Sequence, residues 1–235
     1  MTYPGELVNS TSTILFDFFH TLSSIETAND ALPPESWRIM GLDEKAWRQE
    51  WSRLSSARLK GEIKDPYELL SIPARAVNPA VDEQLIRAAV QARLDKFSKA
   101  VLRIDASVIQ TLEVLRNRGK KLGLVSNADV MEIASWNESP LRDVFDTAIF
   151  SCMVGIVKPD KGIYLRACSK LSVNPAECLF VGDGGSDELK GAKLLGMATI
   201  QITEILAKFW PELIEERGRY ADCRIDTVTA LTGDV

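Results

Sequence analysis

The sequence predicts an α/β protein with a mostly parallel sheet, into which an all-helical segment is inserted. Five short apolar runs lack the alternation of half-buried strands, which is typical of strands covered on both faces. Helical patterns lie between the later runs, as expected for a parallel sheet with right-handed crossovers. The 235 residues include 46% hydrophobic side chains, enough for a sizeable core.

The elements of this sheet can be placed along the chain. The predicted strands are Thr13–Asp17, Lys121–Ser126, Thr147–Ser151, Cys178–Asp183 and Met197–Ile202. Helices are predicted between them at Ser107–Arg118, Lys161–Leu171 and Asp187–Leu195. Gly119 and Gly196 follow the first and last of these helices, where a left-handed C-terminal cap is expected. Such a sheet binds its ligand at the carboxyl ends of the strands.

Residues 23–103 break the alternation of strands and helices. The helices predicted there are Glu35–Arg58, Asp65–Leu70 and Pro79–Ala100. Proline and glycine residues mark their boundaries, namely Pro33, Pro34, Gly61, Pro66, Pro73 and Pro79. Trp37, Trp47 and Trp51 recur at helical spacing, which favours packing over a ligand-binding stripe. We therefore predict an α/β core over residues 12–22 and 104–235, and a helical cap over residues 23–103 above the active end of the sheet.

The charge of the chain excludes some classes of partner. Lys and Arg number 28 against 33 acidic residues, which gives a net charge of −5 and no basic surface for a nucleic-acid backbone. A small anionic substrate is compatible with this charge, because a pocket can be locally positive on an acidic protein. The sequence does not indicate an oligomeric state.

The sequence predicts a cytoplasmic location. Residues 1–11 lack the layout of a signal peptide, and no apolar stretch approaches the ~20 residues of a membrane-spanning helix, so we expect no membrane partner. The four cysteines show no C-x-x-C spacing, and we expect buried thiols in a reducing compartment. They are Cys152, Cys168, Cys178 and Cys223.

Polar residues stand at four places in the predicted sheet, either at the end of a strand or in the loop that follows it. Asp17 supplies a carboxylate, Ser126 a hydroxyl and Lys158 a cation, while Asp183 and Asp187 supply a second acidic group. Because the carboxyl ends of parallel strands meet in one crevice, these side chains together predict an active site. Facing carboxylates repel and need a cation between them, and Mg²⁺ prefers such oxygen ligands. The ion and Lys158 would neutralise a phosphoryl group while Asp17 attacks it.

With these motifs the chain resembles the haloacid dehalogenase-like (HAD) hydrolases. Their first motif, D-x-D-x-T after a strand, matches Asp17 to Thr21 except at its third position, Phe19. Ser126 matches the second motif and Lys158-Pro159 the third. The fourth, G-D-x-x-x-D, matches Gly182 to Asp187. The resemblance implies a Rossmann-like core with a helical cap at the first insertion point.

The resemblance also implies roles for the matching residues. Asp17 would be the nucleophile and a Mg²⁺ ligand, with Asp183 and the backbone carbonyl of Phe19 as further ligands. Asp187 would orient the waters of the metal or Lys158. The residues implied to hold the phosphoryl oxygens are Ser126 and Asn127.

Phe19 departs from the pattern of the family's phosphatases. There, an aspartate protonates the leaving alkoxide and then activates water, which is general acid–base chemistry that Phe lacks. Dehalogenases and phosphonatases of the family also lack this acid. The fourth motif of the dehalogenases is S-S-N-x-x-D, and these enzymes work without metal. This chain differs from them, because Asp183 keeps the metal-binding aspartate. His20, the only histidine, either replaces the acid or serves the turn.

The function predicted from these motifs is a Mg²⁺-dependent phosphatase that acts on a small phosphorylated metabolite through an aspartyl-phosphate. The alternatives are a dehalogenase or phosphonatase and a phosphate-binding protein with impaired turnover. In the cap, Arg58, Lys60 and Gly61 resemble a substrate-specificity loop. The alternative for these three residues is a solvated helix terminus with a glycine cap.

Overall fold

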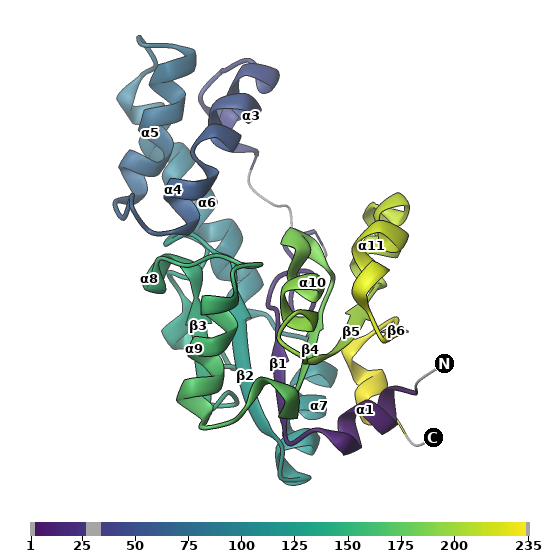
Figure 1. Cartoon of the computed structure of the whole chain (residues 1–235). Coiled ribbons are helices and arrows are strands. Elements are labelled where there is room, and N and C mark those ends of the chain that lie inside the picture. The colour runs from purple at the N-terminus through teal and green to yellow at the C-terminus, as the bar shows by residue number, and fades with distance from the viewer. Residues whose placement is uncertain (1–2, 27–33, 234–235) are drawn as a thin grey trace.

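The core of the protein is a six-stranded parallel sheet with the strand order β3-β2-β1-β4-β5-β6 (Figure 1). The computed structural model describes residues 3–26 and 34–233. The strands are β1 Thr13–Phe16, β2 Lys121–Ser126, β3 Thr147–Phe150, β4 Cys178–Gly182, β5 Ala198–Ile202 and β6 Cys223–Ile225. The predicted fold class is confirmed. Strand β6 was not among the predicted strands, because it has only 3 residues and one buried side chain.

Strand β1 fixes the position of the site, because it lies between β2 and β4. All four of its residues are buried, with Ile14 and Phe16 in the core of one face and Leu15 in the core of the other. Phe16 is paired with Leu124 of β2 and Val181 of β4. The three strands therefore end next to one another, and the residues that follow them converge.

Helices cover both faces of the sheet. One face carries α1 Pro4–Ser10, α7 Ala106–Asn117 and the 3-10 turn η6 Val228–Leu231. The other carries α9 Lys161–Leu171 and α10 Glu188–Lys193. Short helices follow β3 and β5, namely α8 Ser151–Val154, α11 Glu204–Phe209, η4 Pro211–Leu213, α12 Ile214–Arg217 and η5 Gly218–Tyr220. No helix in the described part of the chain is long and apolar enough to cross a membrane.

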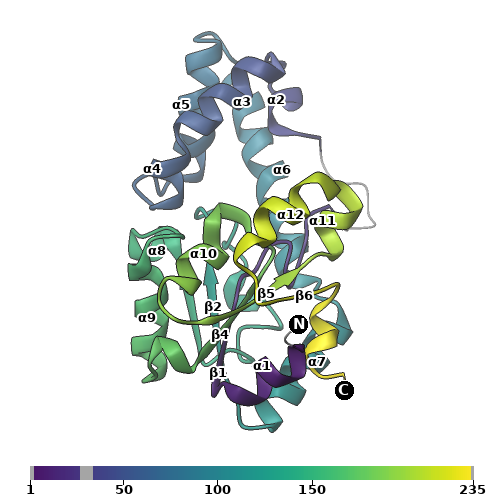
Figure 2. The ribbon, with the colours of Figure 1, turned by 45° about the vertical axis from the view of Figure 1, so that its right-hand side comes forward.

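The helices inserted between β1 and β2 stand beyond one end of the sheet (Figure 2). They are α2 Ser36–Ile39, α3 Glu44–Arg53, α4 Ser55–Leu59, α5 Pro66–Val77 and α6 Glu83–Leu102. They form a hydrophobic cluster of their own, in which Trp47 is buried and against which Trp37 and Trp51 pack, as predicted. Residues 27–33 of the predicted cap, including Pro33, lie outside the described residues.

Two features of the cap differ from the sequence analysis. The helix predicted over residues 35–58 is divided into three, and Gly41 between α2 and α3 has a φ of 63°, which favours glycine. Pro73 lies inside α5 instead of ending a helix. Its ring is buried with Leu69 and Leu70, so the packing of this face outweighs the backbone hydrogen bond that proline cannot donate.

The chain enters and leaves the cap at neighbouring points. Ser23, just after the first motif, donates a hydrogen bond from Oγ to the carbonyl of Ala100 in α6. Ser23 also forms an isolated bridge with Phe19. The two connections between core and cap are therefore tied together beside the active end of the sheet.

Candidate active site

Lys158 lies between two buried carboxylates at the centre of the site. Asp17 directly follows β1, and Lys158 lies in the loop that leads to α9. The Nζ atom of Lys158 donates to Oδ1 of Asp17 and to Oε2 of Glu188, the first residue of α10. All three side chains are buried, so their ion pairing is shielded from water.

Asp183 completes a cluster of three carboxylates. Oxygen atoms of Asp17, Asp183 and Glu188 all lie within 4.8 Å of one another. Backbone N–H groups of the loop after β4 hold two of them: Gly185 donates to Asp183 Oδ1 and Gly184 to Glu188 Oε1, each at 2.9 Å. Among the residues that the structure describes, this is the only group of acidic, histidine or cysteine side chains arranged to hold a metal ion.

The cluster carries more negative than positive charge. Burial raises the pKa of Asp17 above its usual value, with Lys158 opposing the shift and Asp183 adding to it. Burial and the charge of Asp17 raise the pKa of Glu188 well above its usual range. Burial alone would lower the pKa of Lys158, but the two carboxylates outweigh it and raise that pKa. A cation would therefore stabilise the ionised form of the cluster.

Ser126 ends β2 with a buried hydroxyl that has no partner. The residue is 1% exposed, and its Oγ forms no hydrogen bond within the described structure. A buried polar group without a partner is costly, so an oxygen of a bound substrate would satisfy it.

Asn127 holds the backbone of Lys158 in place. Its Oδ1 accepts the N–H of Lys158 at 2.7 Å, and its Nδ2 donates to the Lys158 carbonyl at 3.0 Å. Both polar atoms of the side-chain amide therefore already form hydrogen bonds. The direct contact between Asn127 and a phosphoryl group stays a prediction.

The structure places Glu188, and not Asp187, in the acidic cluster. Asp187 has a φ of 53°, its side chain is 66% exposed, and its nearest cation is Lys190 Nζ at 4.0 Å. The expected contact of Asp187 with Lys158 is absent, because Glu188 makes that contact. The other expected role of Asp187, toward the waters of a metal, stays a prediction. Glu188 shares the buried face of α10 with Gly191 and Ala192. An acid on an otherwise apolar helix face is the signal that could have identified it.

Phe19 forms an apolar contact between core and cap. Its ring packs edge-on against Phe18 and against Phe97 of α6, with ring centroids 4.7 and 5.5 Å apart. The position at which the family's phosphatases have an acid is thus occupied by a packed aromatic ring. The contact of its backbone carbonyl with a metal stays a prediction.

His20 lies against two carboxylates. Its Nε2 is 3.1 Å from Glu26 Oε2, and its Nδ1 is 3.9 Å from Asp183 Oδ2. Burial lowers the pKa of His20, but the hydrogen bond and charge of Glu26 outweigh it, so the pKa is raised. The backbone of His20 has a φ of 64°, which fits the role in a turn, and its catalytic role stays a prediction.

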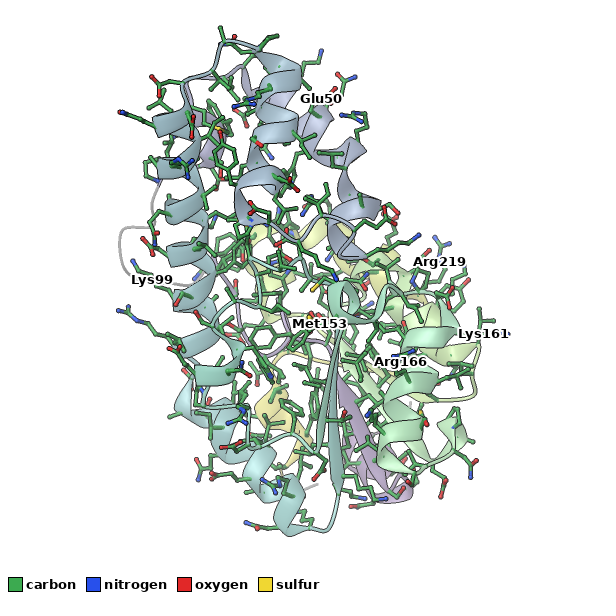
Figure 3. The ribbon with its side chains drawn as sticks, turned by 90° about the vertical axis from the view of Figure 1, so that its left-hand side faces the viewer. Glu50, Lys99, Met153, Lys161, Arg166 and Arg219 are labelled. Atoms are coloured by element: carbon green, nitrogen blue, oxygen red, sulfur yellow. The ribbon has the colours of Figure 1, made fainter. Side chains whose placement is uncertain are left out.

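The predicted specificity loop packs on the core. Arg58 is buried, so the alternative of a solvated terminus fails for this residue. A Cβ at Gly61 would lie 2.0 Å from the carbonyl oxygen of Cys152 in α8, and its φ is 67°, so the close approach requires glycine. Figure 3 labels Met153, the next residue of α8 at this junction. Lys60 is half-buried, and its contact with a substrate stays a prediction.

An ion cluster built on the buried pair of Arg58 and Asp129 joins the cap to the core. Arg58 Nη1 donates to Asp129 Oδ2 at 2.7 Å, and Arg93 Nη2 donates to the same oxygen at 3.0 Å. Arg93 also pairs with Glu132 at 2.6 Å. The guanidinium of Arg58 lies 3.7 Å from the ring centroid of Trp51. Arg93, Asp129 and Glu132 could not be predicted from the sequence, because isolated charged residues form no motif.

A family model matches most of the chain. It describes haloacid dehalogenase-like hydrolases and matches residues 11–196. The chain belongs to this family. The resemblance predicted from the motifs is therefore confirmed, and so is the assignment of the chain as a hydrolase.

Individual relatives of this HAD-like hydrolase include phosphatases and dehalogenases. The chain is 31% identical over 152 residues to the glyceraldehyde 3-phosphate phosphatase of Methanopyrus kandleri. This alignment covers 63% of the chain and 58% of that protein. The chain is 26% identical over 230 residues to an (S)-2-haloacid dehalogenase of Pseudomonas sp. strain YL, covering 93% and 91%. The structure of a 2-haloacid dehalogenase from Pseudomonas syringae pv. Tomato DC3000 shares the fold, with a TM-score of 0.65, 24% identity and coverage of 94% and 96%.

Proposed function

We propose that this hydrolase is a Mg²⁺-dependent phosphatase that acts on a small phosphorylated metabolite. The observation that carries the proposal is the buried cluster of Asp17, Asp183 and Glu188, whose three carboxylates outnumber the two cations paired with them, Lys158 and Arg217. Oxygen ligands of this kind suit Mg²⁺. The similarity to a glyceraldehyde 3-phosphate phosphatase supports this class of substrate.

The residues of the cluster fit a divalent ion. Asp17, Asp183 and the carbonyl of Phe19 would hold it, and Glu188 would hold Lys158 in place. When bound, Mg²⁺ would supply positive charge against the phosphoryl oxygens and favour the ionised carboxylate of Asp17. The unpartnered hydroxyl of Ser126 would donate to one phosphoryl oxygen, which satisfies its buried Oγ.

Asp17 performs the covalent chemistry in this proposal. Its carboxylate attacks phosphorus, the bond from phosphorus to the leaving oxygen breaks, and the electron pair departs with that oxygen. Water then hydrolyses the aspartyl-phosphate and regenerates Asp17. Lys158 stays charged next to Asp17 and counters the negative charge that develops on the phosphoryl group.

Phe19 favours a second candidate, which is dehalogenation. A halide leaves without a proton, so the reaction needs no acid at this position. Asp17 would attack carbon, the carbon–halogen bond would break, and water would hydrolyse the resulting ester. The similarity to an (S)-2-haloacid dehalogenase over nearly the whole chain supports this candidate.

The two candidates are separated by the product released and its dependence on metal. We expect phosphate release from p-nitrophenyl phosphate with Mg²⁺, none with EDTA, and no chloride release from 2-chloropropionate. Asp183→Asn should abolish the phosphatase activity, whereas Asp143→Asn, a change at a side chain that is 89% exposed, should leave it nearly unchanged. Chloride release in EDTA without phosphate release would overturn the proposal in favour of the dehalogenase.

We also place this enzyme in the cytoplasm. All four cysteines are free thiols and three of them are buried, which fits a reducing compartment. Fractionation of cells that express the tagged chain would test the location.

A further inference from the structure

The connection between β5 and β6 reaches the acidic cluster independently of the cap. Residues 204–220 form α11, η4, α12 and η5, at the end of the sheet that faces the cap (Figure 2). Arg217 Nη1 of this segment donates to Asp183 Oδ2. Trp210 of the same segment packs on the ring of His20, with ring centroids 5.3 Å apart.

Arg217 binds the carboxylate oxygen of Asp183 that the backbone leaves free. Oδ1 of Asp183 accepts the N–H of Gly185, while Oδ2 is paired with Arg217 and lies 3.9 Å from His20 Nδ1. A divalent ion held by Asp17 and Asp183 would bring a second cation to this carboxylate. Two cations close together repel, so the guanidinium and the ion oppose each other.

The segment is closely seated on the loop after β4. A Cβ at Gly184 would lie 2.5 Å from the carbonyl oxygen of Arg217, and one at Gly218 would lie 2.2 Å from Gln201 Oε1. Gln201 Nε2 also donates to the carbonyl of Ile214 at 3.0 Å. These approaches place Arg217 on Asp183 in a defined position.

The same segment has little apolar anchorage. Its only buried residues are Ile205 and Leu206 of α11; none of residues 207–220 is buried, and the side chain of Arg217 is 28% exposed. Segments with few buried apolar contacts open at low free-energy cost while the core stays folded. Arg217 can therefore leave Asp183 toward solvent without disturbing the sheet.

We propose that Arg217 and a divalent cation compete for Asp183, so that ion binding releases Arg217 and loosens residues 204–220. This inference rests on the proposed function, because it concerns the same metal site. Arg217 is then a positioning residue that sets the metal affinity and couples it to the conformation of a segment outside the cap. The two effects are linked. The contact between Arg217 and Asp183 lowers the affinity for the ion by the same factor by which the bound ion lowers the stability of that contact.

The first test compares Mg²⁺ binding by calorimetry in the parent, Arg217→Gln, Arg217→Lys and Arg219→Gln. Arg219 provides the matched control, because it lies on the outside of the molecule, is exposed and makes no ion pair within the described residues (Figure 3). We expect Arg217→Gln to bind Mg²⁺ at least about fivefold more tightly than Arg219→Gln, and Arg217→Lys to resemble the parent. Equal dissociation constants for the two Gln variants would overturn the competition.

The second test measures hydrogen exchange of residues 204–220. Mg²⁺ should speed exchange there in the parent, and Arg217→Gln should exchange fast without the ion. Slower exchange of this segment on adding Mg²⁺ to the parent would overturn the inference while leaving the metal site intact. If neither the parent nor any Arg217 variant binds Mg²⁺, the proposed metal site and this inference both fail.

Discussion

Arg58 of the cap and Asp129 of the core form a buried ion pair, with 2.7 Å between Nη1 and Oδ2. Arg93 of α6 shares the same oxygen of Asp129, and the ring of Trp51 covers the guanidinium of Arg58. Two helices of the cap are thereby bound to the loop after β2, close to Ser126. Because the pair is shielded from water, removing one partner leaves buried charge uncompensated.

We predict that Asp129→Asn loosens the cap. The free energy of unfolding should fall by about 3 kcal/mol, because the buried guanidinium of Arg58 and the partly buried one of Arg93 lose their shared carboxylate. KM should rise because the cap loses its ionic contact with the loop after β2. Urea unfolding and steady-state kinetics measure the two effects.

The exposed ion pair of Arg87 and Glu83 in α6 provides the control for this change. Its side chains are 64% and 57% exposed, so Glu83→Gln should change the free energy of unfolding by less than about 1 kcal/mol. Equal losses for Asp129→Asn and Glu83→Gln would show that the buried pair does not hold the cap.

Glu132 predicts a pH dependence of stability. Burial and the charge of Asp129 raise the pKa of Glu132 from 4.5 to about 7. Between these values the folded state holds more protons than the unfolded state, so the free energy of unfolding should fall as the pH rises from about 4.5 to about 7. The contribution of one such group is at most about 1.4 kcal/mol per pH unit. Glu132→Gln should flatten this slope in urea unfolding at several pH values, and unchanged profiles would contradict the assignment.

Phe19 predicts a steep dependence of the phosphatase rate on the leaving group. Without an acid at this position, alkyl phosphates must lose a poorly stabilised alkoxide, whereas aryl phosphates lose a stabilised anion. We expect kcat/KM to be higher for aryl than for alkyl phosphates. Phe19→Asp should reduce this difference by restoring the acid. It should also lower stability, because the ring contact with Phe97 is lost.

Equal kcat/KM values for alkyl and aryl phosphates in the parent would show that another group supplies the proton. His20→Gln then identifies the group. A further loss of alkyl phosphatase activity, with Mg²⁺ binding intact, would assign the proton to His20, and no loss would leave His20 a role in the turn.

We predict that a substitution at Asn127 impairs catalysis but leaves metal binding nearly unchanged. Asn127→Ala removes both hydrogen bonds to the Lys158 backbone, so kcat should fall by about tenfold or more as the lysine loses its position. The dissociation constant of Mg²⁺ should change little, because the ion's expected ligands, Asp17 and Asp183, are untouched. An equal loss of metal affinity would show instead that the variant disturbs the whole site.

The sheet and the residues at its strand ends could be predicted because both depend on local patterns. Apolar runs identified the central strands, and parallel pairing then brought Asp17 and Asp183 together. Strand pairing alone does not assign Glu188, because the left-handed backbone at Asp187 decides which of the two neighbouring acids faces inward. Arg217 was equally inaccessible, since it lies 34 residues beyond Asp183 and reaches it only through tertiary packing.

The hydrogen bond from Ser23 to the carbonyl of Ala100 has a consequence for how such a molecule can evolve. Since both ends of the inserted helices lie side by side, the insert can be lengthened, shortened or replaced without changing any pairing in the sheet. Selection for a new substrate can therefore act on the helices while Asp17 and Lys158 keep their geometry. The junction at Ser23 and Ala100 thus lets the length and sequence of the cap vary separately from the residues at the strand ends.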